Sequence, residues 1–206
     1  MIRSPLFALM TALFAVLSVQ ACGPVGFVMG AGATAGMAAY QERGVEGAAR
    51  DVRTSSDIFE LYSRTDHTLI KDIGVEVYEG RVLLTGQVKT ETERAEAVRL
   101  AWSAIDVKDV INEIHVTQMG GLLDTARDAW ITAQLETKIT FDDRIFAINY
   151  SIETVGATVY LIGIAQNQEE LDRVKNQARA IPYVRHIISH VRIKTLPPDH
   201  QVNGTK

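Results

Sequence analysis

Residues 81–88 read RVLLTGQV, and residues 158–165 read TVYLIGIA. Both stretches are rich in residues that favour β-strands, and both carry a glycine at the sixth position. A shift of 77 residues places the first stretch on the second, and the same shift aligns residues 49–117 with residues 126–194 without a gap. Identical residues recur along this alignment, so the chain contains an internal duplication.

Each copy predicts the same order of five elements, α-β-β-α-β. Apolar residues spaced four apart share one face of a helix and indicate the first element. These residues are Thr54, Ile58 and Tyr62 in the first copy and Ile131, Leu135 and Ile139 in the second. Next come a short strand-like alternation of apolar residues, a turn that contains glycine, and the quoted strand. Two strands this close together predict a hairpin. A charged helix follows, capped by Thr90 or Asn167, and a last strand closes each copy. The inner face of this charged helix is expected to carry Ala97, Ala101 and Ile105, or Val174, Ala178 and Ile181.

The N-terminus predicts a secreted protein with a lipid anchor. Residues 6–19 carry no charge and are too short for a membrane span, which is typical of a signal-peptide core. The segment ends at VQAC, where Cys22 is the only cysteine of the chain. This ending resembles a bacterial lipobox, although Gln20 stands where a small residue is preferred. We therefore expect a signal peptide over residues 1–21 and acyl chains on Cys22; an ordinary secretory signal with a chance cysteine is the alternative.

Gly23 follows the cysteine where lipoproteins retained in the inner membrane usually carry Asp, so the lipobox resemblance implies the bacterial outer membrane, with the protein facing the periplasm. Residues 22–48 are rich in Gly and Ala and are expected to form a tether. Their small-xxx-small spacings leave helix packing in the membrane open as an alternative. Residues 118–125 are predicted to be a linker, and residues 195–206 a disordered tail.

Several function classes are disfavoured by the composition and motifs. The net charge of −4 argues against nucleic-acid binding. No nucleophile, P-loop or metalloprotease pattern occurs, so we expect neither an enzyme nor a cofactor. His186 and His190 fall on a predicted strand, where residues four apart lie about 13 Å from each other and cannot share a metal ion. The metal-site prediction is therefore also none.

The order of elements, the GRVLLTG strand and the closing strand VINEIHV resemble the BON domain. Two such units behind a lipobox cysteine are similar to the dual-BON outer-membrane lipoproteins. The resemblance implies tandem αββαβ domains of α+β class at residues 49–117 and 126–194, each a small three-stranded sheet packed by two helices. It also implies phospholipid binding, a role in envelope integrity and no enzymatic activity.

The second copy carries Trp130 where the first has Arg53. In dual-BON lipoproteins the first helix of the second domain is the implied lipid-contacting surface, and tryptophan favours the headgroup level of a bilayer. The predicted lipid-binding residues are Trp130, Ile131, Arg127, Lys138, Arg144 and Phe141. Burial of Trp130 in a core or between domains is the alternative. Trp102, at the edge of the charged helix of copy one, is a candidate contact between domains or with a partner.

Charge also differs between the copies. The first has 9 basic and 13 acidic residues, and the second has 9 and 8. Because basic residues are attracted to anionic lipid, the second copy is the better membrane-facing unit. The expected partners are anionic phospholipids such as phosphatidylglycerol and cardiolipin. The alternative function is an adaptor that docks envelope, outer-membrane assembly or division proteins.

Overall fold

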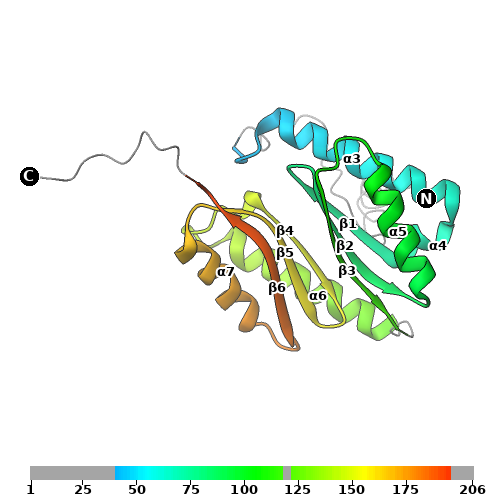
Figure 1. Ribbon diagram of the computed structural model, residues 1–206. Helices are drawn as coiled ribbons and strands as arrows, with labels where there is room; N and C mark the ends of the chain where they lie inside the picture. The colour runs from blue at the N-terminus through cyan, green and yellow to red at the C-terminus, as the bar shows by residue number, and fades with distance from the viewer. Residues whose placement is uncertain (1–39, 118–121, 196–206) are drawn as a thin grey trace, which may run out of the picture.

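A computed structural model describes residues 40–117 and 122–195, and it confirms two tandem αββαβ units of α+β class (Figure 1). The first unit contains α3 (Gly44–Thr65), α4 (His67–Asp72), β1 (Ile73–Tyr78), β2 (Arg81–Val88), α5 (Glu91–Ser103) and β3 (Asp109–Val116). The second contains α6 (Leu122–Thr140), the 3-10 turn η1 (Ala147–Asn149), β4 (Tyr150–Val155), β5 (Thr158–Ala165), α7 (Gln168–Arg179) and β6 (His186–Ile193).

Each unit forms one three-stranded sheet with the quoted strand at its centre. In the first unit β2 pairs antiparallel with β1 and parallel with β3. In the second, β5 pairs in the same way with β4 and β6. The parallel pairing requires a crossover, which α5 or α7 supplies. The predicted strands 81–88 and 158–165 match β2 and β5 end for end.

The predicted caps of the charged helices are confirmed. The Thr90 hydroxyl accepts from the backbone N–H of Glu93, whose side chain in turn accepts from the Thr90 N–H, which is a complete capping box. The Asn167 side chain accepts from the N–H of Glu170. Acidic residues occupy the first turn of both helices, where the helix dipole favours negative charge.

The helices differ from the prediction at four places. The short helix α4 was not predicted, and it begins where Asp66 accepts from the N–H of Thr68. Helix α3 begins at Gly44, inside the stretch predicted as tether, and α6 begins at Leu122, inside the predicted linker. Ile105 is exposed although it was expected on the inner face of α5, because the helix ends at Ser103 and the chain turns away.

Gly86 and Gly163 lie at the same place in β2 and β5, and both have positive φ angles, 126° and 146°. A Cβ built at Gly86 would lie 2.1 Å from the carbonyl oxygen of Asp72, and one at Gly163 would lie 2.0 Å from that of Asn149. The backbone of the preceding segment therefore approaches too closely for any side chain. This is the close approach that a glycine inside a strand indicates.

The two units pack through their sheets and place their helices outside. One core lies between α3, α5 and the first sheet, and another lies between α6, α7 and the second sheet. A third apolar cluster joins the free faces of the two sheets and contains Tyr78, Leu83, Tyr160 and Ile162. The result is a sandwich of helices, sheet, sheet and helices (Figure 1).

Polar contacts surround the apolar cluster between the sheets. His115 Nε2 lies 2.8 Å from the Tyr160 hydroxyl, and a guanidinium nitrogen of Arg81 donates to the carbonyl of His190. The segment before α3 also crosses to the second unit. There the N–H of Glu42 donates to Asn149, and the Glu42 carboxylate accepts from Gln166 and from Lys194.

Among the residues that the structure describes, no helix combines the length and apolar character needed to cross a membrane. The predicted signal peptide at residues 1–21, Cys22 and most of the predicted tether lie outside the described residues, as do residues 118–121 of the linker and 196–206 of the tail.

Candidate functional site

Helix α6 presents a stripe of exposed apolar side chains. Leu123 is 79% exposed, Trp130 42% and Phe141 84%. Because an α-helix turns 100° per residue, positions 123 and 141 each lie within about 20° of position 130 around the axis. Phe141 directly follows α6, and its N–H still donates to the carbonyl of Thr137 in the helical pattern. The three side chains therefore form one line about 27 Å long, which we call the α6 stripe.

Trp130, at the centre of the α6 stripe, contacts a second aromatic residue. The Tyr183 ring lies 6.2 Å away, centroid to centroid, and the ring planes meet at 69°. The guanidinium carbon of Arg127 lies 5.5 Å from the Tyr183 centroid, within cation–π range. An edge-to-face aromatic pair with an adjacent cation fixes these side chains at the surface without burying them.

Tyr183 reaches Trp130 from the turn between α7 and β6. Its φ angle is 73°, in the left-handed region that bulky residues rarely adopt. The turn is held by main-chain bonds on both sides, because Val184 donates to the carbonyl of Ile181 and Arg185 donates to that of Ala157. The ring is 65% exposed, so core packing does not account for a tyrosine at this place.

The first unit has no such aromatic pair. The repeat places Arg53 on Trp130 and Asp106 on Tyr183. Asp106 has the same left-handed backbone, with a φ angle of 60°, and aspartate tolerates that conformation better than tyrosine does. Two positions that carry charged residues in the first copy thus carry two aromatic residues in the second copy, and these aromatic residues contact each other. Sequence reasoning compared positions 53 and 130 and missed Tyr183, which the same comparison at positions 106 and 183 would have found.

The structure separates the six predicted lipid-binding residues. Trp130, Phe141, Lys138 and Arg144 are exposed, and Arg127 is half-buried beside Tyr183. Ile131 is 0% exposed and packs in the core with Leu135 and Ile139, so its assignment to the lipid surface was wrong. The physical reason is the helical step of 100°, which turns Ile131 inward when Trp130 faces outward.

The acidic residues beside the α6 stripe are paired with cations. Asp124 accepts from Arg127 at 2.8 Å. Asp142 lies within 4 Å of two guanidinium groups, those of Arg144 and Arg173. These pairs offset negative charge that would otherwise oppose an anionic ligand near the stripe.

Asp128, the acidic residue of the repeated Ala-Arg-Asp motif, has a structural role. Its carboxylate accepts from the backbone N–H groups of Gly156 and Ala157 in the β4–β5 turn. Asp51, the matching residue, accepts from Glu79 and Gly80 in the β1–β2 turn. The motif therefore ties the first helix of each unit to its hairpin.

The two histidines of β6 have separate surroundings. His186 is exposed, whereas His190 is half-buried and bonded to Glu113. Within residues 40–117 and 122–195, no group of three or more His, Cys, Asp or Glu side chains is placed to hold a metal ion.

Comparison with known proteins identifies the repeated unit. A family model described as the BON domain matches residues 50–118 and 127–195. The chain is 39% identical over 151 residues to an Anaplasma centrale protein named "Uncharacterized protein in gshII 5'region", covering 73% of this chain and 96% of that one.

Two further relatives are proteins of other bacteria. The chain is 29% identical to the "Outer membrane lipoprotein DolP" of Haemophilus influenzae, covering 82% of this chain and 87% of that one. It is also 29% identical to the "Osmotically-inducible protein Y" of Escherichia coli, covering 63% and 66%. Because the BON model covers most of both units, the chain belongs to the BON-domain family and is a dual-BON protein of the DolP type.

Proposed function

We propose that this chain is a non-enzymatic lipoprotein of the bacterial outer membrane, anchored by acylated Cys22 and facing the periplasm. Its second BON domain contacts anionic phospholipid through the α6 stripe, and this contact serves envelope integrity. The single observation that carries the lipid contact is the exposed Trp130–Tyr183 pair in line with Leu123 and Phe141. The outer-membrane lipoprotein among the relatives supports the location.

The shape of the α6 stripe suits a bilayer surface. A straight line of separate apolar side chains on one helix inserts shallowly at the headgroup level, where Trp and Tyr keep a polar atom hydrated. Arg127 lies beside the stripe, next to Tyr183, and Lys138 is exposed on the same helix. Each basic residue near an anionic surface contributes about 1 kcal/mol of attraction.

The test is co-sedimentation of the chain from Gly23 onward with vesicles. Phosphatidylglycerol and cardiolipin vesicles are compared with phosphatidylcholine vesicles. We expect selective binding to the anionic vesicles and at least tenfold weaker binding by Trp130→Glu. Trp102→Glu is the matched control, because Trp102 is also an exposed helical tryptophan, 51% exposed, but belongs to the first unit. Circular dichroism confirms that both variants are folded.

Equal binding by the wild type and Trp130→Glu would contradict the proposed surface. Absence of binding by the folded wild type would contradict lipid contact by the domain altogether. The anchor is tested separately by growing a bacterial host with an alkyne-tagged palmitate analogue. Label should be incorporated into the full chain and lost in Cys22→Ser.

A second candidate function, docking of an envelope protein, is favoured by the exposed apolar residues of the first unit. Val45 and Val52 are seven residues apart on one face of α3, and Trp102 and Ile105 are exposed at the end of α5. A photo-crosslinking amino acid placed at position 102 should then give a protein adduct in cells, whereas one at position 130 should give a lipid adduct. A lipid adduct at both positions would exclude this second role.

A further inference from the structure

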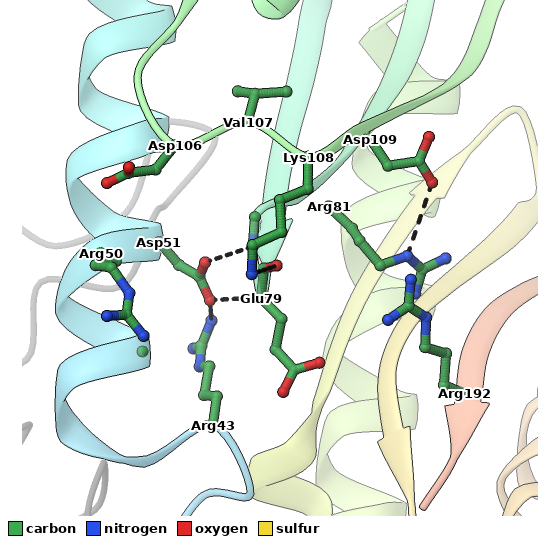
Figure 2. Close-up of a pocket in the computed structure, with 12 residues that line it drawn as sticks. Arg43, Arg50, Asp51, Glu79, Arg81, Asp106, Val107, Lys108, Asp109 and Arg192 are labelled. Atoms are coloured by element: carbon green, nitrogen blue, oxygen red, sulfur yellow. Dashed lines mark hydrogen bonds and ion pairs between the residues drawn. The ribbon is translucent and has the colours of Figure 1, made fainter.

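A cleft of about 610 Å³ opens where the two units meet, and none of the α6 stripe residues lines it (Figure 2). It is lined by residues of α3 and the segment before it, of the β1–β2 turn and the start of β2, of the loop between α5 and β3, and of β6. Its basic residues are Arg43, Arg50, Arg81, Lys108 and Arg192. The volume lies in the range of small-molecule sites.

Three of these cations are already engaged. Arg43 pairs with Asp51 at 2.7 Å, and Arg50 pairs with Glu46 at the same distance. The ammonium group of Lys108 donates to the carbonyl of Glu79 at 3.0 Å. These residues form the wall of the cleft, and the charges of the two arginines among them are balanced by carboxylates.

Arg81 is different, because it is nearly buried and incompletely bonded. Its side chain is 10% exposed, and one terminal nitrogen donates to the carbonyl of His190 at 2.9 Å. Among the described residues its Nε has no hydrogen-bond partner, and the nearest carboxylate oxygen, on Asp109, is 3.9 Å away. A buried guanidinium with an unsatisfied donor costs free energy that a bound anion would recover.

Arg192 of the second unit extends into the same cleft (Figure 2). Burial, followed by the positive charge of Arg192, lowers the pKa of Arg81. Within the described part of the chain, the side chain of Arg192 forms no hydrogen bond and no ion pair. Two guanidinium groups, one from each unit, thus face each other in the cleft. Its carboxylates are those of Asp51, Glu79, Asp106 and Asp109, and among the described residues only Asp109 lies within 4 Å of either guanidinium group, at 3.9 Å from Arg81.

We propose that Arg81 and Arg192 together bind a phosphate group in this cleft, carried either by free phosphate or by a phospholipid headgroup. A phosphate carries up to two negative charges, which matches two guanidinium groups. The planar guanidinium fork binds phosphate oxygens through two parallel hydrogen bonds. Because the two arginines come from different units, the bound phosphate also joins the units.

This site is independent of the lipid contact proposed for the α6 stripe. The test therefore uses ligands without acyl chains, which the stripe does not bind. The purified full chain, in a non-ionic detergent, is titrated calorimetrically with inorganic phosphate at ionic strength matched by sodium chloride. A parallel titration uses glycerophosphoglycerol, the deacylated headgroup of phosphatidylglycerol.

We expect saturable binding of one equivalent and at least tenfold weaker binding by Arg192→Gln. Arg192 is exposed and unpaired, so this substitution leaves the fold intact. Asp109→Asn should bind two- to threefold more tightly, because it removes the carboxylate that competes for Arg81. Arg64→Gln, an exposed arginine of α3 paired with Glu60, and Trp130→Glu should bind like the wild type.

The outcomes separate the possibilities. Tighter binding of glycerophosphoglycerol than of inorganic phosphate assigns the site to a lipid headgroup, and the reverse order assigns it to free phosphate. The proposal is overturned if neither ligand gives a saturable signal. It is also overturned if Arg192→Gln binds as well as the wild type, or if Arg64→Gln weakens binding equally, since either result would show only non-specific charge attraction.

Discussion

Glu113 and His190 occupy the same position in the two repeats, 77 residues apart, and they bind each other: Nε2 of His190 donates to Oε1 of Glu113 at 2.8 Å. Contact between equivalent residues is the signature of an interface with two-fold symmetry. The two units therefore pack like the subunits of a symmetric dimer joined in one chain.

A second pair of equivalent residues obeys the same symmetry. Glu76 of β1 lies near Ser151 of β4, whose side chain opposes the rise in the pKa of Glu76. Its counterpart Glu153 of β4 lies over Gly74 of β1, where an added Cβ would be 3.9 Å from the Glu153 carboxyl carbon. Gly74 and Ser151 are equivalent positions of the repeat. Each glutamate therefore lies beside the same repeat position on the sheet of the other unit. The repeat thus carries two carboxyl groups into one interface.

The packing of the units should weaken as the pH rises. Burial raises the pKa of Glu76 to about 7, with nearby Glu136 adding to the rise and Ser151 and Arg43 opposing it. Burial also raises the pKa of Glu153 to about 7, followed by the charges of Glu76, Glu136 and Asp128. An exposed glutamate ionises near 4.5. Between these pH values the packed form holds protons that the separated form releases. Each of the two carboxyl groups should therefore lower the free energy of unfolding by about 2–3 kcal/mol from pH 4.5 to pH 7, and the fall should level off above pH 7.

Urea unfolding at pH 5 and pH 8 measures this effect, and Glu153→Gln should remove about half of it and stabilise the protein at pH 8. Glu60→Gln is the control, because Glu60 forms only an exposed ion pair with Arg64. Equal pH dependence in Glu153→Gln and the wild type would show that the interface carboxyl groups do not control packing.

Removal of the carboxylate that holds a hairpin should destabilise its unit. Asp128→Ala leaves the N–H groups of Gly156 and Ala157 without their partner, at an expected cost of about 2 kcal/mol. Asp51→Ala should cost more, because it also leaves the half-buried guanidinium of Arg43 unpaired. Chemical denaturation measures both, with Asp124→Ala as an exposed control. A change as small as that of the control would rule out the role assigned to the motif.

The strand glycine of the second unit should not tolerate a side chain. Gly163→Ala places a methyl group against the carbonyl of Asn149 and forces a non-glycine residue to positive φ. We expect a loss of more than about 3 kcal/mol or failure to fold, seen in the melting temperature and the soluble yield. Gly156→Asn is the matched control. A Cβ at position 156 would make only an ordinary van der Waals contact, and asparagine tolerates the left-handed φ of that turn.

Tyr183→Asp should separate stability from lipid binding. The substitution restores the residue of the first unit and relieves backbone strain of about 1–3 kcal/mol, while it removes the contacts with Trp130 and Arg127. The melting temperature should change little or rise, and binding to phosphatidylglycerol vesicles should fall several-fold. A variant that loses stability but keeps full vesicle binding would show that the tyrosine serves the fold.

The sequence was sufficient to predict the internal duplication and the elements that are defined by a regular spacing of residues. The 77-residue shift, the spacing of Ile131 and Leu135 and the caps at Thr90 and Asn167 all depend on neighbours along the chain, and each is confirmed. Trp130 was also singled out, because an aromatic residue replaces a charge there.

Features that depend on the path of the chain in space were not predictable. Tyr183 meets Trp130 only because a left-handed turn brings the end of α7 beside α6. The approach of Arg81 to Arg192 and of Glu76 to Glu153 requires the two sheets to face each other, and no local pattern encodes that packing. Ile105 was misassigned because its position continues a helical period that the chain has already left.

The hydrogen bonds that join Glu42 to Asn149, Gln166 and Lys194 fix the point at which the segment before α3 is attached to the folded units. That place lies on the second unit, which also carries the α6 stripe. The 17 residues between Cys22 and Tyr40 allow these two residues to lie at most about 60 Å apart. With Cys22 acylated as proposed, the tethered stripe meets the bilayer at a local concentration in the millimolar range. Even a weak contact would then be occupied most of the time, and the second unit could release and regain the lipid surface without leaving the membrane.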